Sequence, residues 1–504
     1  MNTFKRVFGD EKKMGLYSGD RRELECDFIF STIQTISKEE HLGNFSKDHF
    51  DYIIIDESHR SGADSYTNLL NYFSSSFLLG MTATPERTDG NNIFKLFDHN
   101  IAYEIRLNRA MEEDLLCSFH YYGVTDLFID GTLIEERAMF NALISEERVN
   151  RIIESSRFYG SDNGITRGLI FCSKVEEATE LSRLFNERGY RTVALVGSSS
   201  EDFRASSIER LESNDWNEQL DFIFTVDVFN EGIDIPKVNQ IIMLRPTQSS
   251  IVFVQQLGRG LRKADGKGYL TVIDFIGNYS SNYLIPMALY GDNSYNKDTL
   301  RKLVADGSRL IPGSSTVNFD QISKDRIFKA IDSANLHLKK DLEKDFELLK
   351  YKLGRLPMMM DFVLHGNRDP FMFVSYAGSY VNFIMKVEKD FSPSMTKEQL
   401  TYLELFNQEI NNGKRVVESI VLSLLIEQAQ LNLYQLNQVL FDQFGFEISE
   451  DTWTSCIRNL NFEFVRKAKE VVEISGDNIH FTNSFSLNLS NENFSHYLKD
   501  SIAY

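Results

Sequence analysis

The sequence is poor in cysteine and has no long apolar run, and both absences narrow what the protein can be. Its four cysteines, Cys26, Cys117, Cys172 and Cys456, form no CxxC pair and lie far apart, which argues against a disulfide framework or a zinc site. Such cysteine usage is typical of a reducing compartment, so we expect a cytoplasmic location. No stretch approaches the roughly 20 apolar residues of a membrane-spanning helix, and the N-terminal MNTFKRVFGDEKK lacks the apolar core of a signal peptide.

Positive charge is also scarce. The 504 residues contain 54 lysines and arginines against 73 aspartates and glutamates, which gives a formal net charge of −19. This balance gives no support to a protein that coats nucleic acid by bulk attraction, although a locally basic cleft that grips one strand stays compatible with it. The length allows about three domains, and the hydrophobic content of 42% is ordinary for a globular protein.

What the sequence does contain is an alternation of short apolar runs with helical patterns. The apolar runs occupy residues 27–31, 52–55, 76–81, 167–173, 191–197, 221–226, 240–246 and 268–276. Strands that alternate with helices predict two α/β layers with parallel sheets. Residues 125–160 predict a largely helical connector between the layers. After about residue 290 the pattern is mainly helical, and residues 325–353 keep helical spacing up to a predicted C-cap at Gly354.

The first chemical motif is DESH, residues 56–59. It follows an apolar run typical of a strand buried in a parallel sheet, and such strands carry functional groups at their carboxyl ends. Asp56 and Glu57 are adjacent carboxylates that suit a magnesium ion and a catalytic water. The tetrapeptide alone is weak evidence, because roughly a few per cent of chains this long contain it by chance. A buried strand that ends in a solvated acidic turn explains it equally well.

Two further segments follow in order. TATPER, residues 82–87, comes directly after the next apolar run, so we expect Thr82 and Thr84 at the same edge of the sheet as the acids. In the second layer, TVDVFNEGIDIP, residues 225–236, contains a strand, a turn and a glycine followed by an acid.

The last motif is QQLGRGLR, residues 255–262, which places Arg259 and Arg262 at i and i+3 on one predicted helical face. Two guanidiniums aimed together can neutralise a phosphoryl-transfer transition state from across a domain cleft. A salt-bridged surface helix would be the better explanation of this segment by itself. Four such segments in this order make coincidence negligible.

DESH, TATPER, NEGIDIP and QQLGRGLR resemble motifs II, III, V and VI of superfamily-two helicases of the DEAD/DEAH-box kind. STIQTI (residues 31–36) resembles the motif between I and II that touches nucleic acid, and GLIFCS (residues 168–173) resembles motif IV. The resemblance covers about residues 1–285. Within it, IDESHRSGADSY, LLGMTATPERTDG and LLCSFHYYGVTD are similar to bacterial helicases close to restriction-enzyme motor subunits. Residues 291–504 resemble the domain of unknown function that follows the motor in one such group.

The resemblance implies ATP and Mg²⁺ as cofactors and DNA as the partner, with RNA left open and no membrane involved. It implies a role in restriction, repair or phage defence. Asp56 would hold magnesium, and Glu57 would orient or deprotonate the attacking water. Gln255, Arg259 and Arg262 would close on ATP from the second lobe.

The other implied site residues form two groups. Those that would bind ATP or couple it to the nucleic-acid groove are His59, Thr82, Thr84, Gly232 and Asp234. Those that would lie near nucleic acid are Thr32, Gln34, Gly197 and Thr225. Neutral hydroxyls and backbone amides suit contacts to a sugar-phosphate backbone that read no base.

One expected motif is missing from the sequence. A nucleotide motor needs a glycine-rich loop that carries GK[ST], but Gly266-Lys267 is followed by Gly268, and Gly413-Lys414 is followed by Arg415. In this family the loop comes before STIQTI, so we expect an N-terminally truncated first lobe that binds ATP poorly by itself. The loss of its strand should also expose the apolar flanks of residues 27–31, 52–55 and 76–81.

Two interpretations of this absence stay open. The chain is a fragment of an active motor, or it is a non-enzymatic nucleic-acid-binding or scaffold remnant of one. Many members of the group carry a phospholipase-D-type nuclease ahead of the motor, so a nuclease domain or subunit encoded upstream is a further partner that the resemblance implies.

The C-terminal region offers one more pattern. Residues 416–482 predict three helices and then a hairpin around Gly476-Asp477, which is the order of a winged helix. Four basic residues, Arg458, Arg466, Lys467 and Lys469, would put positive charge near its third helix and wing. A helical packing module without a nucleic-acid role explains the segment at least as well.

The expected architecture is therefore α/β, with two RecA-like parallel-sheet lobes, the first incomplete, followed by a mainly helical region. The expected domains are a partial first lobe at 1–115, a connector at 116–160, a second lobe at 161–290, a helical domain at 291–415 and the winged-helix-like module at 416–504.

Overall fold

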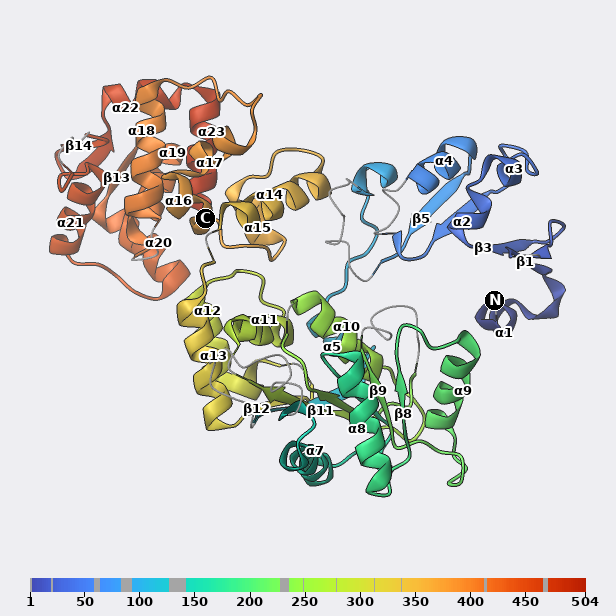
Figure 1. Ribbon diagram of the computed structural model, residues 1–504. Helices are drawn as coiled ribbons and strands as arrows, with labels where there is room; N and C mark the ends of the chain where they lie inside the picture. Colours follow the sequence, from blue (N-terminus) through green and yellow to red (C-terminus); the bar gives the residue numbers. More distant parts are fainter. Residues whose placement is uncertain are drawn as a thin grey trace. The chain divides into compact units, whose positions relative to one another are not determined.

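The structure is a computed structural model (Figure 1). It describes residues 2–19, 21–58, 64–82, 93–126, 142–226, 235–247, 249–277, 279–311, 313–336, 338–411, 415–465 and 470–504. The chain forms two compact units. The first consists of Met1–Ala102 and Leu342–Met358, and the second consists of Tyr103–Asp341 and Met359–Tyr504.

The first unit contains two small sheets that are covered on one face by short helices. Parallel strands β1 (Met14–Ser18) and β3 (Phe28–Ser31) form one sheet with β2 (Arg21–Arg22), and β4 (Tyr52–Ile55) pairs in parallel with β5 (Phe77–Gly80) in the other. The helices are α2 (Ile33–Ile36), α3 (Glu39–Leu42) and α4 (Asp64–Tyr72). Their apolar residues enclose a core of Tyr17, Leu42, Phe45, Leu69 and Phe73.

The opposite face of the β4–β5 sheet is open to solvent. Tyr52, Ile54 and Phe77 expose 70%, 51% and 48% of their surface, and Tyr52 lies directly opposite Phe77 in the register of the two strands. Residues 52–55 and 76–81 therefore expose apolar side chains, as the sequence predicted. The prediction was wrong for residues 27–31, because Phe4 and Phe8 of α1 (Asn2–Phe8) pack their rings against Phe28 at centroid distances of 5.6 and 5.0 Å.

The second unit is built on a seven-stranded sheet in the order β12-β6-β11-β10-β7-β9-β8. Every pair of neighbouring strands in it is parallel, so the predicted α/β class is confirmed. The strands are β6 (Ser118–Thr125), β7 (Gly168–Phe171), β8 (Thr192–Leu195), β9 (Phe222–Thr225), β10 (Gln240–Met243), β11 (Tyr269–Ile276) and β12 (Thr316–Phe319).

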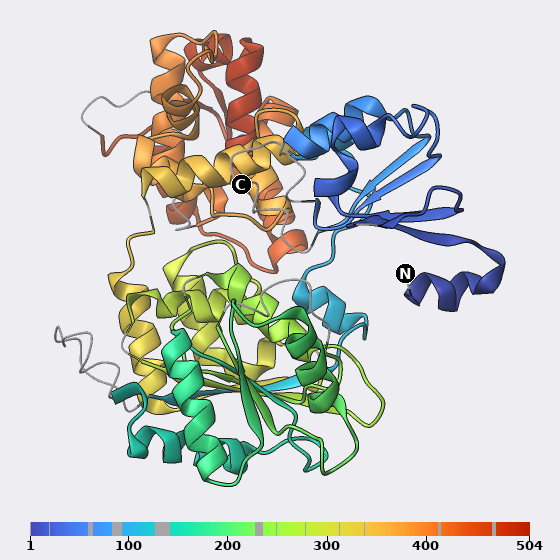
Figure 2. The ribbon, with the colours of Figure 1, turned by 45° about the vertical axis from the view of Figure 1, so that its right-hand side comes forward.

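Helices cover both faces of this sheet. On one face α7 (Glu146–Tyr159) and α8 (Val175–Glu187) pack against Ile170 of β7, whereas Leu169 and Phe171 of the same strand face the other helix layer. That second layer consists of α9 (Glu201–Glu212), α10 (Ser250–Gly260), α11 (Leu284–Tyr290), α12 (Lys297–Asp306) and α13 (Gln321–Ser333). Both views show the sheet between the two layers (Figures 1 and 2). A central strand buried on both faces needs the continuous apolar composition from which these strands were predicted.

Two strands of this sheet fall outside the segments that the sequence assigned to the second lobe. β6 lies in the predicted connector, and β12 lies in the predicted helical domain. β6 pairs with β11 over its whole length, and β12 pairs with β6 at the edge. The sheet of the second lobe therefore draws on residues from 118 to 319. The helical pattern of residues 325–353 likewise corresponds to two helices, α13 and α14 (Lys339–Leu353), and Gly354 follows α14 with a φ of +68°.

The rest of the second unit is mainly helical and ends in a small mixed module. Its helices before residue 415 are α15 (Met359–Leu364), α16 (Phe371–Ala377), α17 (Tyr380–Val387) and α18 (Lys397–Leu405). The module consists of α19 (Val417–Gln428), β13 (Gln430–Asn432), α20 (Leu433–Phe444), α21 (Glu450–Leu460), β14 (Val472–Ser475) and β15 (Asn478–Phe481). Its three strands are antiparallel in the order β13-β15-β14. The predicted three helices and hairpin are confirmed, and β13 completes the order of a winged helix.

Two last helices, α22 (Asn483–Leu489) and α23 (Glu492–Ala503), complete the chain's described part. None of the described helices is long and apolar enough to cross a membrane.

Candidate functional site

The two acids of the DESH motif lie at the carboxyl end of β4, next to the carboxyl end of β5. Met81 donates its backbone N–H to Ile55 O at 2.9 Å, and Ser58 donates its N–H to Met81 O at 2.9 Å. These bonds tie the turn after β4 to the residue that precedes Thr82. Asp56 and Thr82 therefore emerge from neighbouring strands at one edge of the sheet, as predicted.

The backbone of Glu57 adopts an unusual conformation. Its φ is +51°, in the left-handed region, which costs a residue with a Cβ roughly 1–2 kcal/mol. Its N–H donates to Asp56 Oδ1 at 3.0 Å. The turn leaves Asp56 exposed and Glu57 half-buried. Strained residues at a strand end are typical of functional sites, where the backbone directs a side chain that regular geometry would send elsewhere.

The chemistry of these acids fits a magnesium ion that is shared with phosphate. The described residues contain no group of three or more histidine, cysteine, aspartate or glutamate side chains that could hold a metal by themselves. Mg²⁺ is usually bound by one or two carboxylates together with substrate phosphates and water. A single exposed carboxylate, Asp56, beside a second acid is the protein contribution that such a site needs.

The first two nucleic-acid candidates lie at the carboxyl end of β3. Thr32 is the N-terminal cap residue of α2, and its hydroxyl lies 2.9 Å from that of Thr35. Thr32 and Gln34 are both exposed. Their positions give them access to a ligand outside the strand end.

Four predicted site residues, His59, Thr84, Gly232 and Asp234, lie outside the described residues. The described residues that flank these segments are Ser58 and Asp64, Thr82 and Ile93, and Val226 and Ile235. Ile235 is fully buried in the core of the second unit.

In the second unit, Thr225 is the last residue of β9, and Gly197 lies two residues after the end of the neighbouring strand β8. Thr225 is fully buried, and its hydroxyl has no hydrogen-bond partner among the described residues. Gly197 is exposed, and its carbonyl accepts a hydrogen bond from Arg204 Nη2 at 2.7 Å. A Cβ built on Gly197 would meet no atom within 4 Å, so the backbone there is open to approach.

The arginine motif is only partly helical. Gln255 and Arg259 lie in α10, but the helix ends at Gly260, so Arg262 comes after its C-cap residue Leu261. The prediction that Arg259 and Arg262 share one helical face is therefore wrong, because α10 ends before Arg262. Arg262 is exposed, and Gln255 Oε1 has no partner within the part of the chain that the structure describes.

Helix α10 runs back along the sheet, so that its last turn lies by the amino ends of the strands. Cys117, which directly precedes β6, donates its N–H to Leu261 O at 2.8 Å. A Cβ on Gly260 would lie 2.5 Å from Leu270 Cδ1 at the start of β11 and 3.1 Å from Ile241 Cδ1 at the start of β10. A larger residue at position 260 would therefore require the side chain of Leu270 to shift.

The candidate residues of the second unit therefore fall into two places. Gly197 and Thr225 lie at the carboxyl edge of the sheet, and Arg259 and Arg262 lie near its amino edge. The structure thus separates the residues that the resemblance places near nucleic acid from those that it places near ATP.

A buried ion cluster, which sequence reasoning missed, holds the carboxyl edge together. Arg148 of α7 donates to Asp126, to Glu177 and to the carbonyl of Leu244, and Glu177 accepts the N–H of Ser173 at 2.8 Å. Burial alone would lower the pKa of Arg148, but the two carboxylates outweigh it and raise that pKa. No local pattern could have predicted the cluster, because its members are far apart in sequence.

A second missed pair lies beside α10. With its side-chain oxygen turned toward Arg245, the buried Gln256 accepts a hydrogen bond from Arg245 Nε at 3.1 Å. Arg245 lies near the end of the run predicted at residues 240–246, two residues after β10 ends at Met243, so its place at a strand end was the available indication.

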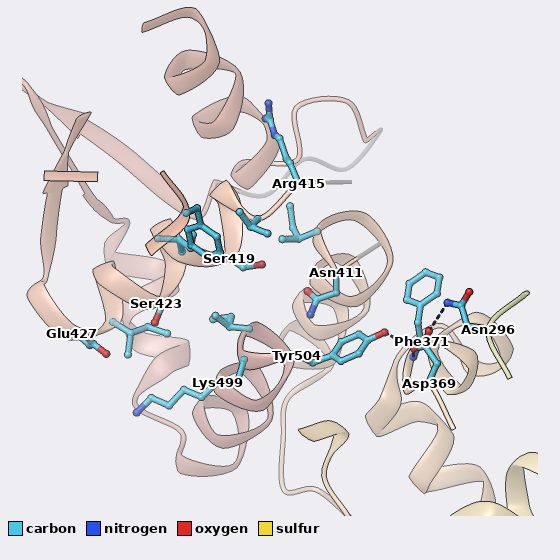
Figure 3. A pocket seen from close by; sticks show the side chains of 17 residues that line it. Asn296, Asp369, Phe371, Asn411, Arg415, Ser419, Ser423, Glu427, Lys499 and Tyr504 are labelled. Carbon is cyan, nitrogen blue, oxygen red and sulfur yellow. Dashed lines mark hydrogen bonds between the residues drawn. The ribbon is translucent and has the colours of Figure 1, made fainter. Parts of the chain in front are cut away.

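The C-terminal region contains a separate cavity of about 900 Å³, lined in part by α19 and α23 (Figure 3). Asn296 Nδ2 donates to Asp369 Oδ2 at 3.0 Å, and the hydroxyl of Tyr504 donates to the same carboxylate. The described residues that line the cavity include none of the predicted site residues.

Three family matches cover much of the chain. Residues 1–87 match "Type III restriction enzyme, res subunit", residues 147–264 match "Helicase conserved C-terminal domain", and residues 342–504 match a domain of unknown function, DUF8090.

Individual relatives are distant. The chain is 26% identical over 331 residues to the putative ATP-dependent helicase IRC3 of Saccharomyces cerevisiae, which covers 61% of this chain and 46% of that protein. It is 24% identical over 267 residues to the type I restriction enzyme EcoAI endonuclease subunit of Escherichia coli, with coverages of 45% and 32%. The fragment structure of a putative HsdR subunit of a type I restriction enzyme from Vibrio vulnificus is 23% identical, with a TM-score of 0.42 and coverages of 54% and 51%.

The chain spans about half the length of the curated relatives that it matches, at 46% and 50% for two of them. The two motor families match in the order in which the motifs occur, and the relatives carry the names of helicases and restriction enzymes. Over residues 1–87 and 147–264 the chain is therefore similar to superfamily-two helicases of the restriction-enzyme motor type.

Proposed function

We propose that the full-length protein that contains this chain is an ATP-dependent DNA helicase or translocase. The observation that carries the proposal is the strand-end arrangement of the first unit. Asp56 and Glu57 leave β4 where Thr82 leaves β5, and the hydrogen bond from Ser58 to Met81 joins the two segments. In such a motor the acids that hold the metal and the water must be linked to a segment that moves when phosphate leaves. The hydrogen bond from Ser58 to Met81 would link the acids to the segment that begins at Thr82.

The proposal gives each acid one role. Asp56 would hold Mg²⁺, which when bound neutralises charge on the transferred phosphoryl group. Glu57 would orient the attacking water and accept its proton. The strained backbone of Glu57 and its N–H bond to Asp56 Oδ1 fix the two carboxylates relative to each other.

The second unit would supply positive charge and a phosphate contact. Gln255, Arg259 and Arg262 would act on ATP, with Gly232 and Asp234 from the preceding motif. His59, Thr82 and Thr84 would couple the state of the nucleotide to nucleic acid. Thr32, Gln34, Gly197 and Thr225 would lie along the sugar-phosphate backbone. The buried hydroxyl of Thr225, which has no hydrogen-bond partner among the described residues, supports a polar ligand at that edge.

The choice of DNA follows the likeness to a type I restriction enzyme subunit. The same likeness supports a cytoplasmic location and a role in restriction, repair or phage defence. It also supports a nuclease domain or subunit as a partner. RNA is the alternative substrate.

A second candidate function rests on a specific observation. The 504 residues contain no GK[ST] tripeptide, so a non-enzymatic scaffold or nucleic-acid-binding protein that retains the motor's fold is the competing proposal. The two candidates differ in one measurable property, which is ATP hydrolysis that depends on Glu57.

The test is Glu57→Gln in the full-length protein. Glutamine keeps the size of the side chain but cannot accept a proton, so nucleic-acid-stimulated hydrolysis should fall by about 100-fold or more, while ATP binding is retained. Asp51→Asn is the matched control, because Asp51 is an exposed acid at the opposite, amino end of the same strand. An undiminished rate in Glu57→Gln defeats the assignment of Glu57, and an inactive wild-type protein supports the scaffold.

A further inference from the structure

Lys267 binds backbone carbonyls from two motifs of the second lobe. Its ammonium donates to Pro236 O at 2.9 Å, to Gly260 O at 2.6 Å and to Arg262 O at 2.9 Å. A lysine ammonium has three N–H donors and no acceptor. All of its hydrogen-bonding capacity is therefore used on the main chain.

The three carbonyls lie at the ends of two functional segments. Pro236 is the last residue of NEGIDIP, and Gly260 and Arg262 belong to QQLGRGLR. The carbonyls in the last turn of a helix lack intrahelical partners, and a cation at a helix C-terminus is also favoured by the helix dipole. Lys267 supplies both the donors and the charge at the end of α10.

A neighbouring residue completes the arrangement. Leu261 O, between the two carbonyls of α10's end, accepts the N–H of Cys117 at 2.8 Å. Three successive carbonyls around Arg259 and Arg262 are thus each bonded to a donor from outside the motif. The backbone that carries the two arginines is thus held by hydrogen bonds from Lys267 and from Cys117.

The three hydrogen bonds of Lys267 offset the free-energy cost of burying its ammonium group. Lys267 is half-buried, and burial lowers its pKa, while Cys117 and Asp162 raise it by a smaller amount. No ion pair formed within the described residues includes Lys267. Burying a lysine without a carboxylate is unfavourable unless polar groups compensate, and here the three carbonyls do so.

We propose that Lys267 is a positioning residue, which fixes Pro236, the last residue of NEGIDIP, and the arginine end of α10 relative to each other. The consequence for ATP hydrolysis rests on the proposed function. Arg259 and Arg262 can act on one phosphate group only if their backbone keeps a fixed position with respect to the motif that precedes it. Lys267 belongs to neither motif, and its sequence context, Gly266-Lys267-Gly268, is not that of a phosphate loop.

Two substitutions separate hydrogen bonding from space filling. Lys267→Met keeps the apolar stem and its volume but removes all three donors. Lys267→Arg keeps the charge and the donors. The matched control is Lys237→Met, because Lys237 is also half-buried in this lobe but donates to a single carbonyl outside both motifs, Glu212 O at 2.8 Å.

The first readout is hydrogen–deuterium exchange of the chain. In Lys267→Met, amides in residues 257–263 and at Cys117 should exchange about tenfold faster, the change expected when a charged hydrogen-bond donor is lost. Lys267→Arg should lie closer to the wild type, and Lys237→Met should leave these amides unchanged. Exchange in Lys267→Met that matches the wild type, or that accelerates uniformly over β7 and α8 as well, overturns the proposal.

The second readout is ATP hydrolysis by the full-length protein. Lys267→Met should lower kcat about tenfold with an unchanged KM for nucleic acid, and Lys237→Met should not. Faster local exchange without a fall in kcat overturns the positioning role. If the wild-type protein hydrolyses no ATP, the proposed function fails by itself, and the exchange data still decide whether Lys267 fixes the two segments.

Discussion

At the scale of single residues, Asp274 is a buried carboxyl of the second lobe whose pKa is strongly raised. It is fully enclosed by β11 and its neighbours, and it accepts a hydrogen bond from the hydroxyl of Tyr121 at 2.6 Å. Burial raises its pKa from 3.8 to about 7; the Tyr121 hydrogen bond opposes this shift, and the nearby Asp126 adds to it. In the unfolded chain the same carboxyl ionises at its ordinary pKa.

This difference makes the stability of the lobe depend on pH. Below about pH 4 both states hold the proton. Between the two pKa values the unfolded state has lost its proton and the folded state has not, so the free energy of unfolding falls as pH rises. Above the folded pKa of about 7 Asp274 is ionised in both states, and the free energy of unfolding falls no further.

Asp274→Asn should remove this dependence, because the amide oxygen still accepts from Tyr121 and cannot ionise. We expect the variant to unfold with a free energy roughly 2–4 kcal/mol above the wild type at neutral to alkaline pH, and the gap to close toward pH 4. Urea denaturation of the chain across this range measures it. Asp265→Asn, an exposed turn residue, is the control. If the difference in unfolding free energy between Asp274→Asn and the wild type does not vary with pH, the raised pKa of Asp274 is contradicted.

Sequence reasoning yields candidate site residues that belong to compact motifs and misses residues that make distant contacts. Asp56, Glu57 and Arg259 lie in short segments that can be recognised without a structure. Arg148 is different, because its partners Asp126 and Glu177 lie 22 and 29 residues away. Lys267 binds carbonyl oxygens, which every residue has, so its partners leave no mark on the sequence.

The same contrast holds for whole elements. Strands buried on both faces, such as β7 and β9, were predicted from continuous apolar composition. β6 has the mixed composition SFHYYGVT, and β12 is the four-residue edge strand TVNF, so neither has the continuous apolar run of a central strand. The break between α13 and α14 falls where the sequence has no glycine or proline, between Ser333 and Lys339.

The elements of the two lobes should differ in their resistance to proteases. The strands of the second lobe are buried between two helix layers, whereas β4 and β5 form a two-stranded sheet with one exposed apolar face. Cleavage of transiently open segments follows their local stability. Brief digestion of the chain should therefore cut first within residues 1–102 and protect the strands of the second lobe, which lie between residues 118 and 319.

Mass spectrometry of the fragments identifies the sites of cleavage, and the time course gives their order. Equal or greater resistance of the first unit would mean that the exposed face of β4 and β5 does not weaken it.

At the scale of the whole molecule, the proposed chemistry is divided between the two units. The acids and Thr82 belong to the first, and the arginines and Thr225 belong to the second. A net charge of −19 means that nucleic acid must be held by local contacts rather than by bulk attraction. The residues proposed to act on ATP and on nucleic acid therefore come from both units.

The central claim is that this protein hydrolyses ATP in response to DNA. The most direct measurement is the steady-state rate of ATP hydrolysis by the full-length protein with no nucleic acid, with duplex DNA, with single-stranded DNA and with RNA of matched length. The account predicts a rate that rises severalfold with DNA and less with RNA. A rate that is the same with and without nucleic acid, or that responds to RNA alone, would contradict it.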